Sequence, residues 1–126
     1  MSELNEAVII SAARTPVGKF LGSLKGFTAP ELGAIAVRES VKRAGVKPEE
    51  VDEVIMGCVI QAGLGQVPSR QAAFKAGLGR EVTSDTINRV CASGMRAITL
   101  SSDIIRLGHH QLVEAGGMDS MSNAPY

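Results

Sequence analysis

The stretch from Val82 to Leu107, VTSDTINRVCASGMRAITLSSDIIRL, decides the fold. Its first six residues, 82–87, predict a short strand. The part from near Cys91 to Leu107 predicts a helix, which Gly108 can terminate. A strand followed by a helix is the repeating unit of parallel α/β folds, so the same unit is expected on either side.

Apolar runs flank this stretch in both directions. Residues 54–60, VIMGCVI, and residues 7–13, AVIISAA, are short and continuous, which is typical of strands buried on both faces of a parallel sheet. Downstream, residues 112–115, LVEA, predict the last strand. Four strands are therefore expected in this chain.

Two more helices are expected between the strands. The first begins at Thr28, because Thr28 and Glu31 form a capping-box pattern, and it ends at Gly45. The second runs from about Ser69 to Ala76. Residues 14–27 and 61–66 contain several glycines and predict loops.

The predicted order is βαβαβαβ over a single domain, residues 1–126. Strands separated by single helices take right-handed crossovers and form a mostly parallel sheet. The fold class is therefore α/β, with helices on both faces of the sheet.

The amino-acid composition excludes several classes of function. Thirteen Lys and Arg balance thirteen Asp and Glu, and no dense basic cluster is present, so we expect no nucleic-acid partner. The acidic N-terminus lacks a signal sequence, and no apolar run is long enough to span a membrane. We expect a soluble cytoplasmic protein with no membrane partner.

The two cysteines, Cys58 and Cys91, are far apart and lack metal-ligand spacing, so neither a disulfide nor a metal site is expected. Cys91 falls where a strand passes into a helix, at the sheet edge where α/β sites form. The helix N-terminus there favours a thiolate, and the small residues 92–94 leave room for a substrate carbonyl to accept a backbone N–H bond. Position alone leaves two interpretations open, a nucleophile or a small buried hydrophobe.

The residues around Cys91, INRVCASGMRAI from Ile87 to Ile98, resemble the acyl-accepting segment of thiolases. Three other stretches resemble the same family: residues 14–20, RTPVGKF; residues 69–73, SRQAA; and residues 116–126, GGMDSMSNAPY. The last block is most similar to acetoacetyl-CoA-forming thiolases, although degradative 3-ketoacyl-CoA thiolases share its general shape. The resemblance covers the chain in the family's order and implies a thiolase-like layered fold.

The resemblance implies an acetyl-CoA C-acetyltransferase. Cys91 would accept an acetyl group from acetyl-CoA, and the carbanion of a second acetyl-CoA would attack it to give acetoacetyl-CoA and CoA, or the reverse. Coenzyme A thioesters are then substrates, and no other cofactor is expected. The family also needs a catalytic histidine and a second cysteine from its C-terminal half.

The chain then corresponds to an incomplete N-terminal thiolase domain, cut near the start of the family's loop domain. We expect the missing half, or a second polypeptide, to complete the site, and we expect the isolated chain to be inactive. By the same resemblance the third predicted strand lies at a dimer interface in a homo- or hetero-oligomer.

Other polar residues carry weaker expectations. His109 and His110 follow Gly108 at the far end of the helix, roughly 24 Å from Cys91 at 1.5 Å per residue, so we expect surface positions without a catalytic role. Cys58 is expected in the core, although it could line the pocket. The Gly63–Gly65 loop lacks the third glycine of a dinucleotide site. Scattered cations could attract CoA phosphates but are usually solvated surface: Lys19, Lys25, Arg70 and Arg96.

Two alternatives to the acetyltransferase stay open. A non-catalytic assembly subunit would use Cys91 only structurally. Another condensing enzyme, such as a ketoacyl synthase or a hydroxymethylglutaryl-CoA synthase, shares the fold but differs around the cysteine.

Overall fold

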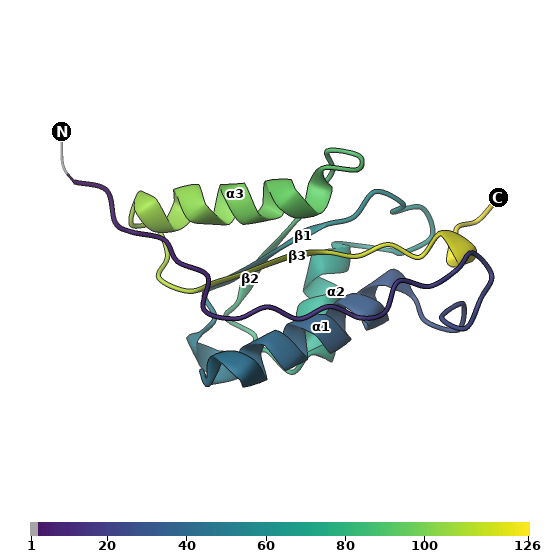
Figure 1. The fold of residues 1–126 in the computed structure, drawn as a ribbon, viewed down its shortest axis with the longest axis horizontal. Coiled ribbons are helices and arrows are strands. Elements are labelled where there is room, and N and C mark those ends of the chain that lie inside the picture. The colour runs from purple at the N-terminus through teal and green to yellow at the C-terminus, as the bar shows by residue number, and fades with distance from the viewer. Residues whose placement is uncertain (1–2) are drawn as a thin grey trace.

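The structure, a computed structural model, describes residues 3–126. Three parallel strands form the sheet: β1 (Glu53–Gly57), β2 (Thr83–Ile87) and β3 (Val113–Gly117), in the order β2-β1-β3. In register, Glu53 lies opposite Thr83 on one side and Val113 on the other. Helix α3 (Ser93–Arg106) covers one face, and α1 (Ala29–Ala44) and α2 (Pro68–Lys75) cover the other (Figure 1). The predicted α/β class and layering are confirmed.

The two faces of the sheet are packed differently. Central strand β1 is buried along its whole length, and its Val54 and Met56 join α1 and α2 in the main apolar core. On the other face, α3 buries only small residues, spaced one helical turn apart: Ser93, Ala97 and Ser101. The α1 and α2 layer is therefore held by apolar volume, whereas α3 is held by close backbone approach.

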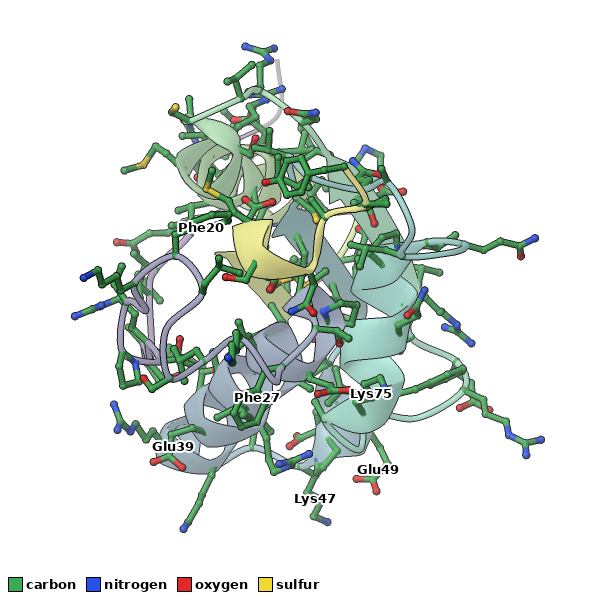
Figure 2. The ribbon with its side chains drawn as sticks, turned by 90° about the vertical axis from the view of Figure 1, so that its right-hand side faces the viewer. Phe20, Phe27, Glu39, Lys47, Glu49 and Lys75 are labelled. Atoms are coloured by element: carbon green, nitrogen blue, oxygen red, sulfur yellow. The ribbon has the colours of Figure 1, made fainter. Side chains whose placement is uncertain are left out.

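The predicted caps of α1 are both present. The Glu31 amide donates to Thr28 Oγ1 over 3.3 Å, and Gly45 ends the helix in a left-handed conformation at a φ of +70°. Charged side chains such as Glu39, Lys47 and Glu49 point outward at the solvent edge of this layer (Figure 2). Sequence alone therefore located this helix to within a residue at each end.

Helix α2 is fixed to the edge strand β2. The Ser69 amide donates to Thr86 Oγ1 over 3.0 Å, and the Thr86 hydroxyl donates to Ser69 Oγ over 2.8 Å. The helix begins at Pro68, directly after Val67 in a left-handed conformation. Two short 3-10 turns complete the chain, Pro48–Glu50 and Met121–Asn123.

The predicted strand over residues 7–13 is wrong, so the order βαβαβαβ loses its first strand. These residues have no regular secondary structure and pair with no strand among residues 3–126, and Val8 and Ile9 are 66% and 76% exposed. Side-chain bonds hold the segment instead: the Ser11 hydroxyl donates to Ser40 O, and Arg43 Nη1 donates to Ala12 O. An apolar run indicates burial, but a strand also requires a neighbour with free backbone groups.

The remaining boundaries differ by a few residues. The predicted strand over 54–60 ends at Gly57, and the last strand runs to Gly117 rather than to residue 115. Helix α3 begins at Ser93, so Cys91 lies in the preceding turn and not in the helix. No helix in the described part of the chain is long and apolar enough to cross a membrane.

We predict that Gly45→Ala lowers the free energy of unfolding by about 1 kcal/mol, because alanine resists a left-handed conformation. An added Cβ at Gly45 meets nothing within 4 Å, so the cost is conformational and not steric. Gly26→Ala is the matched control, because a Cβ there also meets nothing within 4 Å and the backbone is not left-handed. Urea unfolding of both variants measures the difference, and an equal stability of the two would contradict the prediction.

Candidate active site around Cys91

Cys91 lies on a sharp turn between β2 and α3. Val90, directly before it, has a φ of +52°, a left-handed conformation that β-branched residues rarely adopt. The thiol of Cys91 is exposed at the carboxyl edge of the sheet. This exposure contradicts the interpretation of Cys91 as a small buried hydrophobe.

Local hydrogen bonds shape the turn. The Val90 amide donates to Asn88 Oδ1 over 2.8 Å, which closes an Asx turn. The Ala92 and Ser93 amides donate to the carbonyls of Arg89 and Val90, each over 3.1 Å. The Ser93 hydroxyl adds a further link, because its Oγ accepts from the Arg89 amide over 2.8 Å. Two of the three small residues that were expected to offer an amide to a substrate therefore use that amide inside the turn.

Glycines let α3 approach the sheet beside this turn. A Cβ on Gly57 would lie 2.5 Å from the Ser93 carbonyl carbon, a distance that real Cβ atoms do not show. On β3, a Cβ on Gly117 would lie 3.2 Å from Gly94 Cα. The start of α3 is therefore seated on two strands at once, which fixes the position of the turn that holds Cys91.

Cys58 differs from Cys91 in its burial. It is fully buried in the core, as expected, and its thiol lies 3.7 Å from Asp119 Oδ1. Burial, followed by the negative charge of Asp119, raises the pKa of the Cys58 thiol to about 12. Cys58 therefore stays a thiol at physiological pH.

Asp119 is a structural residue that sequence reasoning missed. Its Oδ1 accepts from the Val59 and Ile60 amides over 2.8 and 2.9 Å, so it ties the loop after β1 to the end of β3. The available signal was its position, a carboxylate two residues beyond a strand end, where the carboxyl ends of neighbouring strands meet.

The structure places both histidines at the opposite end of α3 from Cys91. His109 is exposed, as expected, but His110 is only partly exposed and its Nε2 lies 3.3 Å from Glu53 Oε2. Burial and the nearby Asp85 raise the pKa of the Glu53 carboxyl, and His110 opposes that shift. Neither histidine can reach the Cys91 thiol across the length of the helix.

The four scattered cations do not form one site. Arg70 stacks on the Phe74 ring, 4.2 Å from its centroid, and its guanidinium donates to the carbonyls of Val82 and Arg80. Lys19 and Lys25 border a cavity of about 370 Å³ whose lining does not include Cys91. Arg96 lies on α3 and faces Thr99. Among residues 3–126, no group of three or more His, Cys, Asp or Glu could hold a metal ion.

Residues 7–126 match the protein family described as "Thiolase, N-terminal domain". The chain belongs to the thiolase family.

Known thiolases resemble the chain along nearly its whole length. The mitochondrial acetyl-CoA acetyltransferase of Xenopus tropicalis is 56% identical over 98% of this chain, and the acetyl-CoA acetyltransferase of Cupriavidus necator is 54% identical over 98%. The crystal structure of the Bacillus anthracis acetyl-CoA acetyltransferase superposes with a TM-score of 0.95 at 45% identity, over 98% of this chain and 32% of that one. A thiolase of Ascaris suum, solved in complex with coenzyme A, gives a TM-score of 0.94 at 37% identity, over 96% of this chain and 32% of that one.

This thiolase domain is short beside its relatives. It spans 29% of the Xenopus protein and 31% of the Cupriavidus protein. What those whole enzymes do is therefore a proposal for this chain and not a finding.

We predict that iodoacetamide modifies Cys91 and spares Cys58 in the native thiolase domain at about pH 8. The raised pKa keeps Cys58 protonated to about pH 12, so raising the pH from about 7 to about 9 leaves it unreactive. Peptide mass mapping assigns the label, and the same reaction in urea should label both residues. Equal labelling rates for the two native cysteines would contradict the burial of Cys58.

We predict that Gly57→Ala destabilises the fold by about 1 to 3 kcal/mol, because the new methyl must displace the backbone of α3. Gly79→Ala is the control, since its Cβ would make only an ordinary contact, 3.5 Å from Glu81 Oε2. Thermal unfolding compares the two variants. If Gly57→Ala is as stable as Gly79→Ala, the start of α3 is not held by this contact.

Proposed function

We propose that this chain supplies the nucleophilic cysteine of an acetyl-CoA C-acetyltransferase, and that Cys91 is that nucleophile. The observation that carries the proposal is the exposed Cys91 thiol on a strained turn between a strand and a helix of a thiolase N-terminal domain. The names of its relatives, acetyl-CoA acetyltransferases, support the acetyl group as the one transferred.

The first step is an acyl transfer between two thioesters. The Cys91 thiolate attacks the carbonyl carbon of acetyl-CoA, a new C–S bond forms, and the C–S bond to coenzyme A breaks. Coenzyme A leaves as a thiolate that takes up a proton. The energies of the two thioesters are similar, so the step needs a good nucleophile rather than a large driving force.

The second step forms the carbon–carbon bond. A base removes an α-proton from a second acetyl-CoA, and the resulting carbanion attacks the acetyl group on Cys91. Acetoacetyl-CoA forms as the Cys91 Sγ leaves as a thiolate, and the same steps in reverse give thiolysis. The base cannot be His109 or His110, so a histidine and a second cysteine from outside residues 1–126 complete the site in our proposal.

A negative charge develops on the substrate carbonyl oxygen in both steps. Gly94 is the remaining small residue whose amide can face that oxygen, because the Ala92 and Ser93 amides donate within the turn. A helix N-terminus adds a favourable partial charge. A bulky residue at this point would block a carbonyl from approaching.

The substrates in this proposal are coenzyme A thioesters, with no additional cofactor. The partner is the rest of a thiolase, within a homo- or hetero-oligomer. Strand β2 is an edge strand with partly exposed residues, which supports its place at a subunit interface. The relatives' names include mitochondrial and cytosolic forms, so the cytoplasmic location stays a prediction.

The test begins with the protein purified from its native source with everything that assembles with it. Intact masses under denaturing conditions, together with the native mass, show whether the remaining thiolase residues are on the same chain or on a partner. Incubation with isotope-labelled acetyl-CoA should then attach one acetyl group to Cys91. Comparing acetoacetyl-CoA with longer 3-ketoacyl-CoA substrates separates the acetyltransferase from a degradative thiolase.

We predict that Cys91→Ala abolishes both the acetyl label and the formation of acetoacetyl-CoA, because Cys91 is the thiol that takes the acyl group in our proposal. Cys58→Ala is the matched control and should keep the label on Cys91, since Cys58 is buried and protonated. Full turnover by the Cys91→Ala assembly would instead establish a non-catalytic assembly subunit.

A further inference from the structure

The backbone conformation of Val90 requires an explanation. A non-glycine, β-branched residue at a φ of +52° is strained, and such strain persists only where surrounding contacts over-determine it. We infer that Ser93 is the positioning residue that holds Val90 in this conformation and thereby aims the Cys91 thiol at its substrate. This inference rests on the proposed role of Cys91.

The Ser93 side chain bonds to both sides of the strained residue. Its Oγ accepts from the Arg89 amide over 2.8 Å and donates to the Val90 carbonyl oxygen over 2.6 Å. The Arg89 amide precedes Val90 and the Val90 carbonyl follows its φ and ψ angles, so one hydroxyl clamps the two-residue segment Arg89–Val90 at both ends. The Ser93 hydroxyl therefore restrains the chain where it enters Cys91, together with the Ser93 amide, which also donates to the Val90 carbonyl.

Ser93 is itself held in place by the sheet. The residue is 4% exposed, and its Cβ lies where a side chain on Gly57 would otherwise sit, so β1 fixes it from below. The Asn88 side chain holds Val90 less firmly, because it bonds only the Val90 amide and is exposed. Ser93, and not a surface residue, thus anchors the turn to the central strand.

Ser101 shows what an ordinary buried serine does on the same helix. It is 5% exposed, and its hydroxyl donates to the Ala97 carbonyl over 2.7 Å, one turn back in α3. That bond stays within the helix and does not reach the turn. Ser101→Ala removes a buried hydroxyl of the same kind without affecting Val90, and it is the matched control for Ser93→Ala.

The experiment uses the protein as purified with every chain that assembles with it. The readouts are the second-order rate constant for alkylation of Cys91 by iodoacetamide over a range of pH, and kcat and KM for acetoacetyl-CoA cleavage. The variants are Ser93→Ala, Ser101→Ala, Val90→Gly, and Val90→Gly combined with Ser93→Ala. Glycine adopts a positive φ without strain, so it removes the need for the hydroxyl.

We predict that Ser93→Ala slows Cys91 alkylation and lowers kcat by about tenfold, while KM changes by less than about twofold. Ser101→Ala should leave the alkylation rate unchanged. In the Val90→Gly background, Ser93→Ala should cost no more than about threefold, because the conformation of residue 90 no longer needs support.

Several results would overturn the inference. One is a wild-type rate of Cys91 alkylation in Ser93→Ala. Another is a loss of alkylation rate on Ser93→Ala that is equally large in the Val90→Gly background. If Ser93→Ala does not fold, the double variant decides: folding with restored alkylation supports the inference, and failure to fold refutes it. Alkylation of Cys91 requires no acyl transfer, so the two hypotheses can fail separately. Turnover by Cys91→Ala would refute only the proposed function. Wild-type alkylation and kcat in Ser93→Ala, together with an inactive Cys91→Ala, would refute only this inference.

Discussion

The backbone contact between α3 and the sheet is the constraint on which the functional end of this domain depends. Gly57 on β1 and Gly117 on β3 lack the side chains that would hold α3 away, so Ser93 and Gly94 rest directly on the strands. Close-packed backbones tolerate little displacement, because a shift of less than an ångström produces a clash or loses contact. The turn that holds Cys91 ends at this contact, so the contact fixes the position of the turn.

The opposite face of the sheet serves stability rather than positioning. There, α1 and α2 cover β1 with the main apolar cluster, which includes Val37, Val54 and Met56. Apolar burial of this kind is non-directional and accepts changes of similar volume. Separating the two tasks lets one layer hold the fold together while the other positions the strained turn that contains Cys91.

The same division explains the different fates of the two thiols. Cys58 follows β1 into the core beside Asp119, where burial keeps it protonated. Cys91 follows edge strand β2 and is exposed on the turn that leads into α3. The two cysteines thus differ in place as well as in exposure: Cys58 directly follows the buried central strand, and Cys91 lies four residues beyond the end of the edge strand.

Sequence patterns alone located most of this domain and the position of Cys91 between a strand and a helix. The caps at Thr28 and Gly45, the strand and helix around Cys91, and the far placement of the histidines follow from local chemistry, which acts over a few residues. The prediction of a strand over residues 7–13 was wrong because an apolar run favours burial but does not identify a neighbouring strand that could pair with it. Only the tertiary structure decided that Cys91 is exposed, that Val90 is left-handed and that Ser93 bridges it. Those features depend on the approach of α3 to Gly57, a contact between residues far apart in the chain that no local pattern encodes.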